Sequence, residues 1–259
     1  MAKIEYVKEI DDLIPINTVF ATATDKSGLV DNINKKTGKI MPGIPENGII
    51  GVLFEENPNA LVISTGGTAG LIEKAGFKVM PVGDFTGWPE MDTGLVKSMQ
   101  GKLYVGMLAH KYTASDAAYM QKQEIPSIDM VLANFYPFEE TVKNNPMAEK
   151  PSFVGDKPSA FELIRQNMDV GGPTAIHTAR KGFLGTAVTT RAEDYARFIS
   201  DLRKYGGRIS RASRITAMKH CSEDLANYHT AIWEFMKDRT DEEIDRSYPI
   251  THNRAEEAE

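Results

Sequence analysis

Short apolar runs alternate along this chain with segments whose apolar residues recur at helical spacing. Five runs have the length and composition of buried strands, at residues 16–24, 60–66, 77–82, 128–137 and 183–190. Helical patterns occur at residues 67–76, 114–123, 173–182 and 192–207, and three of these four close on glycine, a frequent helix terminator. Continuous apolar strands alternating with helices predict an α/β fold, in which helices cover both faces of a mainly parallel sheet.

The rest of the chain departs from this alternation. The charged stretch 209–238 is largely helical and predicts a C-terminal helical cap, whereas the apolar run 102–108 has the composition of a strand. Segments rich in Asn, Gly, Pro and Lys indicate loops at residues 31–50 and 141–160. We therefore predict a single domain over residues 1–259, with an α/β core at about 14–205, a helical cap at about 206–240 and a polar tail at 241–259.

Charge and composition narrow the function classes. The 259 residues carry a formal net charge of −6, which is unfavourable for broad binding to nucleic acid or to an anionic membrane. Cys221 is the one cysteine, so no internal disulfide forms and a reducing compartment is expected, with a structural role for the thiol. The N-terminus lacks the apolar core of a signal peptide, and no run reaches the roughly 20 apolar residues of a membrane span. We expect a cytoplasmic protein that binds neither nucleic acid nor membrane.

Two turns that follow predicted strands have the composition of a phosphate site. Thr24 and Lys26 lie in a TDKSG turn after the first strand, and Thr65, Gly67 and Thr68 lie in an STGGT turn after the second. Ligands of parallel sheets bind beyond the carboxyl ends of the strands, where exposed amides and a helix N-terminus hold anions. Neither GxxxxGK nor GxGxxG occurs, so a single phosphate fits better than a triphosphate or a dinucleotide. An ordinary tight turn would also explain either stretch alone.

Four side chains outside these turns are further candidates. Lys97 lies in a long polar loop, and Tyr136 ends the fourth predicted strand. Asp169 and Lys181 flank a predicted helix that begins with two glycines and Pro173. From Pro173 to Lys181 this helix would rise about 12 Å, so Asp169 and Lys181 cannot form an i,i+4 pair. From the pattern alone, a solvated lysine, a buried tyrosine and unrelated surface charges remain alternatives to one shared ligand.

The same stretches, in this order, resemble the N-terminal inosine monophosphate (IMP) cyclohydrolase domain of the bifunctional purine biosynthesis proteins. The similarity runs from about residue 16 to residue 235, with an interruption near 31–58, through TATDKSGLV, ISTGGTAGLIEKAGFKV, FTGWPEM, GLVK, IDMVLANFYPFEETV and MDVGGPTAIHTARK. The resemblance implies a methylglyoxal-synthase-like α/β fold. It also implies an enzyme that converts 5-formamidoimidazole-4-carboxamide ribonucleotide (FAICAR) to IMP and water, closing the second purine ring without a metal or an organic cofactor.

Carried over position by position, the resemblance assigns two groups of residues. Those that would bind substrate are Thr24, Lys26, Ser64, Thr65, Gly67, Thr68, Asn134, Gly171 and Gly172, and those that would close the ring are Lys97, Tyr136, Asp169 and Lys181. The carboxamide nitrogen attacks the formyl carbon, so a cation near the formyl oxygen lowers the barrier, and the nitrogen must lose a proton. Lys181 would stabilise that oxygen together with amides of the glycine-rich helix start. Asp169 would accept the proton, with assistance from Tyr136 or Lys97, so both ends of the helix would face one small molecule.

The chain departs from the family pattern at several positions. Leu95 stands where the family has an Arg two positions before the loop Lys, and SMQG at residues 98–101 replaces TLHP, with Gln100 and Gly101 at its end. Further departures are Gly70, Gly182 and the DLANYH stretch at 224–229. Loss of an Arg and a His near a site for an anionic substrate is expected to weaken binding or to change the substrate. The four retained ring-closing candidates argue for activity.

Partners and alternatives depend on how far the resemblance holds. The chain ends where the family's formyl-transferring domain would begin, so the resemblance implies a stand-alone cyclohydrolase that forms a homodimer and works with a separate formyltransferase protein. Two alternatives stay open: another phosphate-ester enzyme of the same fold, such as a lyase, and a non-catalytic purine-nucleotide-binding sensor. The STGGT turn suits the lyase, which leaves NFYPF and DVGGP unexplained, and the missing Arg favours the sensor. Conversion of FAICAR to IMP would separate the three.

Overall fold

The computed structural model describes residues 5–89, 91, 96–109, 111–147 and 158–248. These residues form two compact units. The first joins the described residues up to Phe135 to Val170–Leu225, and the second joins Tyr136–Asp169 to the described residues from Ala226 onward. The predicted boundary near residue 206 does not coincide with this division, because a long helix continues from the first unit into the second.

A five-stranded parallel sheet forms the core of the first unit. Its strands follow the order β4 (Met80–Pro81), β3 (Leu61–Ser64), β2 (Thr18–Thr22), β5 (Met130–Ala133) and β6 (Ala187–Thr189). Each strand lies within one of the five predicted runs, so the predicted parallel α/β sheet is confirmed. The chain moves outward from β2 through β3 and then returns to the other side of β2 through β5, and sheets of this kind bind ligands where the strand order reverses.

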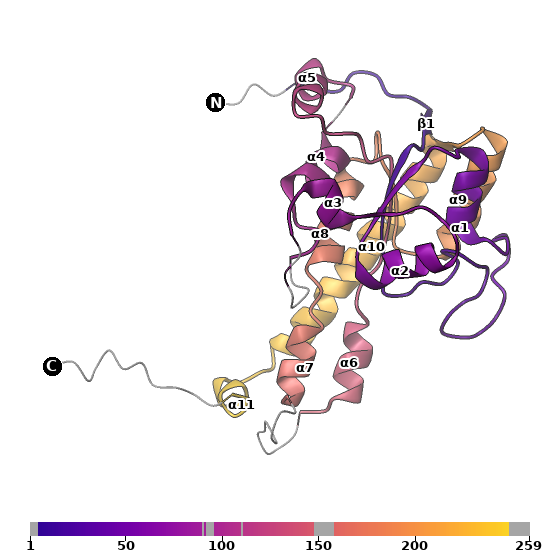
Figure 1. Cartoon of the computed structure of the whole chain (residues 1–259). Coiled ribbons are helices and arrows are strands. Elements are labelled where there is room, and N and C mark those ends of the chain that lie inside the picture. The colour runs from indigo at the N-terminus through magenta and orange to yellow at the C-terminus, as the bar shows by residue number, and fades with distance from the viewer. Residues whose placement is uncertain (1–4, 90, 92–95, 110, 148–157, 249–259) are drawn as a thin grey trace. The chain divides into compact units, whose positions relative to one another are not determined.

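Figure 1 labels the helices of the two units. They are α1 (Gly48–Glu56), α2 (Gly66–Lys74), α3 (Val82–Thr86), α4 (Gly101–Leu108), α5 (Ala114–Lys122), α6 (Phe138–Asn144), α7 (Ala160–Gln166), α8 (Gly171–Lys181), α9 (Glu193–Lys204), α10 (Arg211–Met236) and α11 (Asp241–Asp245). The short strands β1 (Leu13–Pro15) and β7 (Arg208–Ser210) pair antiparallel beside the main sheet. The predicted helices at 67–76, 114–123, 173–182 and 192–207 correspond to α2, α5, α8 and α9.

Helices cover both faces of the five-stranded sheet. Val19 and Ala21 of β2 point into one apolar cluster and Phe20 points into the other, because successive side chains of a strand face opposite sides. α1 packs against α9 in the first cluster, and α4 packs against α8 in the second (Figure 1). A sheet buried on both faces explains why its strands are continuously apolar in the sequence.

The apolar run 102–108 is part of helix α4, so the prediction of a strand there is wrong. Leu103, Gly106 and Met107 are buried at spacings of three and four residues, which is the repeat of a helix. The carbonyl of Gly106 accepts a hydrogen bond from the Ile128 amide at 2.8 Å, so the backbones approach closely where a side chain would not fit. A short apolar run cannot be assigned by periodicity alone, because buried strands and buried helices share it.

The predicted loops and tail also contain helices. α1 begins within the predicted loop at 31–50, and the predicted loop at 141–160 overlaps the end of α6 and the start of α7. α11 lies in the predicted polar tail, where Thr240 caps it in a reciprocal capping box with Glu243. Residues 148–157 and 249–259 lie outside the described residues.

Within the first unit, α10 contacts β6 through Cys221. Cys221 is fully buried, its Sγ lies 3.6 Å from the Val188 carbonyl oxygen, and burial raises the pKa of the thiol to about 12. The thiol therefore stays protonated at neutral pH and donates to the β6 backbone, as expected for a structural cysteine. Among the described helices, α10 included, none is long and apolar enough to cross a bilayer.

The second unit is helical and has its own aromatic core. Phe138 of α6 packs edge-on against Tyr228 and Phe235 of α10, with ring centroids 6.3 and 5.9 Å apart. Phe161 of α7 contacts Phe235 and Tyr248. Edge-to-face ring pairs of this kind add about 0.5–1.5 kcal/mol each to the area that they bury. The helical unit thus contains residues 138–166 in addition to part of the cap predicted over residues 206–240.

Candidate functional site

Asn134 links two strands at the carboxyl end of the sheet, which is the end where the parallel strands finish. Its side-chain oxygen accepts hydrogen bonds from the amides of Thr24 and Asp25 at 2.7 and 3.1 Å, and its side-chain amide donates to the Asp25 carbonyl at 2.8 Å. Asn134 directly follows β5, and the turn that it holds follows β2. The side chain therefore fixes the TDKSG turn at the place where the strand order reverses.

The hydroxyls of the STGGT turn tie β3 to β2. The Thr22 and Thr65 hydroxyls lie 2.9 Å apart, and Thr68 both donates to the Ala23 carbonyl and accepts from the Ala23 amide. Ser64 is fully buried and donates to the neighbouring strand at 2.6 Å. Ser64 and Thr68, both predicted to bind substrate, thus brace the two turns against each other.

Lys97 lies beside the N-terminus of α2. Gly66, the first residue of that helix, has φ +39°, and a β-carbon there would lie 3.3 Å from the Lys97 Nζ. Gly66 and Gly67 are exposed, so the first amides of α2 are accessible from solvent. The ammonium and the helix N-terminus are both positive, and together they favour an anion at this point.

Ser98 brings the same loop to a second helix N-terminus. Ser98 is buried, and its Oγ lies 3.3 Å from the position that a β-carbon of Gly171, the first residue of α8, would occupy. Because Lys97 and Ser98 are adjacent, the N-termini of α2 and α8 lie on either side of a two-residue segment. Ser98 was counted among the departures from the family and not among the binding residues, and only the fold shows where it lies.

Lys26 completes the positive groups at the carboxyl end of the sheet. Its Nζ donates to the Thr24 carbonyl at 3.3 Å, so the ammonium folds back over the turn held by Asn134. The structure thus brings together Thr24, Lys26 and Asn134 at one position and Lys97 with Gly66 at another. It also places Gly171 and Gly172 at the start of α8, with Gly172 buried. Across the described residues, no three His, Cys, Asp or Glu side chains are arranged to hold a metal ion.

Tyr136 and Asp169 belong to the second compact unit. Tyr136 is exposed, and the amide of Asp169 donates a hydrogen bond to the Tyr228 hydroxyl at 2.7 Å. Burial raises the pKa of Tyr228 to about 12, so this hydroxyl remains protonated. In the sequence, Tyr136 is two residues after Asn134, and Asp169 is two residues before Gly171. Asn134 and Gly171 both lie at the carboxyl end of the sheet.

The structure does not bring Lys181 to the carboxyl end of the sheet. Lys181 is the exposed last residue of α8, and the eleven residues of that helix rise roughly 15 Å from Gly171. The helix runs antiparallel to the strands, so its C-terminus lies at their amino ends. There Gly182 packs so closely on the Met107 carbonyl that a β-carbon would lie 2.2 Å from its oxygen.

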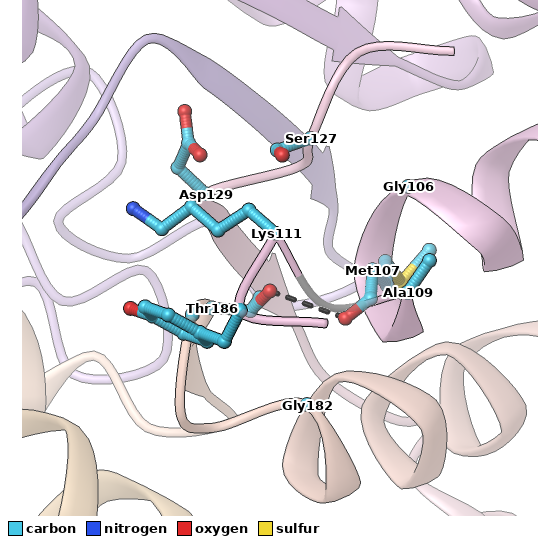
Figure 2. A pocket seen from close by; sticks show the side chains of 10 residues that line it. Gly106, Met107, Ala109, Lys111, Ser127, Asp129, Gly182 and Thr186 are labelled. Carbon is cyan, nitrogen blue, oxygen red and sulfur yellow. Dashed lines mark hydrogen bonds between the residues drawn. The ribbon is translucent and has the colours of Figure 1, made fainter. Parts of the chain in front are cut away.

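A polar hollow occupies this amino end of the sheet, and Figure 2 shows its lining residues. Thr186 donates to the Met107 carbonyl at 3.2 Å, and Asp129 accepts hydrogen bonds from the amides of Asn17 and Thr18 at 2.9 and 3.0 Å. Desolvation raises the pKa of Asp129 to about 6 in spite of these bonds and the nearby Lys111 ammonium. The sequence offered no signal for Asp129, since its role depends on contacts more than 100 residues away.

Asp224, in the DLANYH departure, forms an ion-pair cluster with Arg191, which closely follows β6. Arg191 Nη2 lies 2.6 Å from one Asp224 oxygen and 2.6 Å from Glu223, and these carboxylates hold the pKa of Arg191 above its usual value. The Thr190 hydroxyl donates to Asp224 as well. Thus the residue at the family's His position binds an Arg of this chain. Leu95, which stands where the family has an Arg, lies outside the described residues.

Comparisons with known proteins agree with this architecture. Residues 56–152 match the family described as MGS-like domain. The chain is 36% identical over 178 residues to the bifunctional purine biosynthesis protein PurH of Synechococcus sp. (strain WH7803), covering 69% of this chain and 31% of that protein. It is 30% identical over 237 residues to the PurH protein of Magnetococcus marinus (strain ATCC BAA-1437 / JCM 17883 / MC-1), covering 92% of this chain and 39% of that protein.

A solved structure titled "Crystal structure of ForH" has the same fold, with a TM-score of 0.62 and 24% identity over 84% of this chain and 97% of that chain. The parallel sheet with helices on both faces and the family match together define an MGS-like domain. The chain is a divergent member of this family, related to the MGS-like part of the PurH proteins. It spans between 31% and 39% of the length of these two relatives.

Proposed function

We propose that the carboxyl end of the sheet binds the phosphate of a purine ribonucleotide and that the chain catalyses the IMP cyclohydrolase reaction, in which FAICAR becomes IMP and water. The similarity to two bifunctional purine biosynthesis proteins supports the substrate class. One structural observation carries the proposal furthest: the Lys97 ammonium lies at the N-terminus of α2, while the adjacent Ser98 contacts the N-terminus of α8. Two helix N-termini and a cation would stabilise a phosphate and a developing negative charge.

The reaction balances without a redox partner. The carboxamide nitrogen attacks the formyl carbon and loses one proton, and the formyl oxygen becomes a hydroxyl on a tetrahedral carbon. That hydroxyl then leaves as water with a second proton, from the formamide nitrogen, as the carbon–nitrogen double bond forms. Negative charge develops on the oxygen during attack, so a fixed cation or amide donor beside it lowers the barrier. Holding the two groups face to face supplies much of the remaining rate enhancement.

We assign the oxygen-stabilising role to Lys97, because its ammonium lies beside a helix N-terminus. The resemblance assigns that role to Lys181, which lies at the far end of α8, and a Lys181→Met variant separates the two assignments. A large loss of turnover would return the role to Lys181, and near-wild-type turnover would leave it with Lys97. Asp169 remains our candidate proton acceptor, with Tyr136 as its assistant, on the strength of the resemblance.

The phosphate site is tested through Lys26, whose ammonium folds over the TDKSG turn. Lys26→Ala should weaken IMP binding by about 1.5–3 kcal/mol, the worth of a charge-assisted hydrogen bond, and should leave inosine binding unchanged. Calorimetric titration of both ligands measures the difference. Equal loss of affinity for IMP and inosine would show that the phosphate does not bind at this turn.

The reaction is tested by absorbance-monitored conversion of FAICAR by the purified wild type. Turnover supports the cyclohydrolase. Binding of IMP without turnover would instead favour a nucleotide sensor, and failure of both would point to a different phosphate ester as the substrate.

A further inference from the structure

Residues 31–41 form a small hairpin within the interruption of the family resemblance. Ile33 and Ile40 pair antiparallel, and the Asn34 amide donates to the Lys39 carbonyl at 2.9 Å. The Asn34 side chain accepts from the amides of Lys36 and Thr37 at 3.0 Å, which closes the tip. The tip is therefore an ordered turn, and three of its exposed residues are lysines.

Buried residues on either side hold the hairpin at one place on the first unit. Leu29, Val30, Met41 and Ile44 all pack in the apolar cluster shared by α1 and α9. Gly28 has φ +70°, and a β-carbon there would lie 2.8 Å from Ile44, so the chain turns directly from the TDKSG turn into this core. The hairpin is thus rigidly joined to the turn proposed to hold the phosphate.

Side chains of the TDKSG turn also bind the hairpin directly. Ser27 donates to Asp25 Oδ1 at 2.5 Å, and its oxygen accepts a hydrogen bond from the Lys35 amide at 2.7 Å. The Lys36 Nζ lies 3.9 Å from the other Asp25 oxygen. Lys35 pairs with Asp31 within the hairpin, so Lys36 is the hairpin lysine that reaches the turn.

The negative charge of Asp25 is unfavourable for anion binding at the TDKSG turn, and the Lys36 ammonium offsets it. A carboxylate next to an anion site repels the ligand, and Asp25 lies between Thr24 and Lys26 in the proposed phosphate turn. Lys36 approaches Asp25 from the hairpin and is 69% exposed, so its flexible ammonium can contact Asp25 and a bound anion alike. The turn and hairpin together present Lys26 and Lys36 against the single charge of Asp25.

We propose that the 31–41 hairpin is a phosphate-recognition element, in which Lys36 supplies a second cation beside Lys26 for a phosphomonoester ligand. The inference rests on the proposed phosphate site. It assigns a role to a segment that the family resemblance leaves unmatched, and it makes the charge of this segment part of ligand specificity.

The test compares Lys36→Met with Lys39→Met, a matched change of another exposed lysine on the same hairpin. IMP and inosine are titrated calorimetrically into each variant at low salt, and thermal melts confirm that each variant is folded. Lys36→Met should weaken IMP binding about two- to fivefold, as expected for an exposed charge pair, and leave inosine unchanged. Lys39→Met should change neither ligand, and Lys36→Arg should retain wild-type affinity for IMP.

Two results would overturn the proposal: an unchanged affinity of Lys36→Met for IMP, or an equal loss for IMP and inosine. Lys26→Ala shows which idea has failed. If Lys26→Ala selectively weakens IMP while Lys36→Met does not, the phosphate site stands and the hairpin has no part in it. If neither variant changes the affinity for IMP more than that for inosine, the proposed phosphate site itself is contradicted.

Discussion

The two ends of the parallel sheet carry similar polar side chains and use them differently. At the amino end, Asp129 and Thr186 complete the hydrogen bonding of strand and helix ends, with Asp129 accepting two amides and Thr186 donating to two carbonyls. At the carboxyl end, Lys97 lies over the open start of α2, and Lys26 folds over an exposed turn. Asp129 and Thr186 satisfy backbone groups at the amino end, whereas at the carboxyl end two lysines stand beside side chains, such as Asn134 and Thr68, that satisfy the backbone there.

The direction of the helices explains this difference. Each helix that follows a parallel strand runs back antiparallel to it, so α2 and α8 have their N-termini at the carboxyl end. Their last carbonyls lie at the amino end, where nearby donors must satisfy them. An anion site is therefore favoured at one end only, and substitutions at the two ends should have different consequences.

The largest expected effect is on stability at the amino end. Arg214 is fully buried and donates to five carbonyls, those of Asp11, Asp12, Phe183, Leu184 and Ile209. Arg214→Met removes a buried donor from each of these oxygens, although those of Asp12 and Leu184 keep the Arg211 amide and the Tyr112 hydroxyl as donors. The substitution should lower the free energy of unfolding by about 3–5 kcal/mol, as measured by urea denaturation.

Arg211→Met provides the control for Arg214→Met. Arg211 makes an exposed ion pair with Asp12 at 3.3 Å, so its loss should cost less than about 1 kcal/mol. Similar losses for the two variants would show that the buried guanidinium contributes no more than a surface charge.

The next effect is on turnover at the carboxyl end. If Lys97 stabilises the developing oxyanion, Lys97→Met should lower kcat for FAICAR by about 100- to 1000-fold with little change in KM. Lys74→Met, at the opposite end of α2, should leave kcat unchanged. Steady-state kinetics with FAICAR measure both, and a loss confined to KM would assign Lys97 to the phosphate instead.

The smallest effect is the pH dependence that Asp129 contributes. Its pKa rises from 3.8 to about 6 in the folded protein, so the folded state holds this proton more tightly than the unfolded state. The contribution to stability is full below pH 4 and is lost as pH rises through 6, by roughly 1–3 kcal/mol.

Asp129→Asn should remove this component of the pH dependence, because the amide oxygen can still accept from Asn17 and Thr18. Urea unfolding of both proteins at pH 4.5 and pH 7 gives the difference. Parallel pH profiles would mean that Asp129 titrates as an ordinary exposed carboxylate.

The sequence by itself determined the local elements and the order in which they occur. Apolar runs and glycine stops located the five strands of the sheet and the helices α2, α5, α8 and α9, because both signals depend on residues close in the chain. The same signals placed the TDKSG and STGGT turns after two strands. They failed for α4, since the six apolar and small residues at 103–108 fit a buried strand and a buried helix equally.

Only the tertiary structure decided which polar groups meet. Lys97 is 31 residues from Gly66, and Ser98 is 73 residues from Gly171, yet one short segment lies at the starts of two helices. Lys181 had the motif of a site residue but lies at the other end of its helix, because an eleven-residue helix separates its ends by roughly 15 Å. Contacts between residues so far apart in the chain depend on strand order and helix direction, which no local pattern of residues contains.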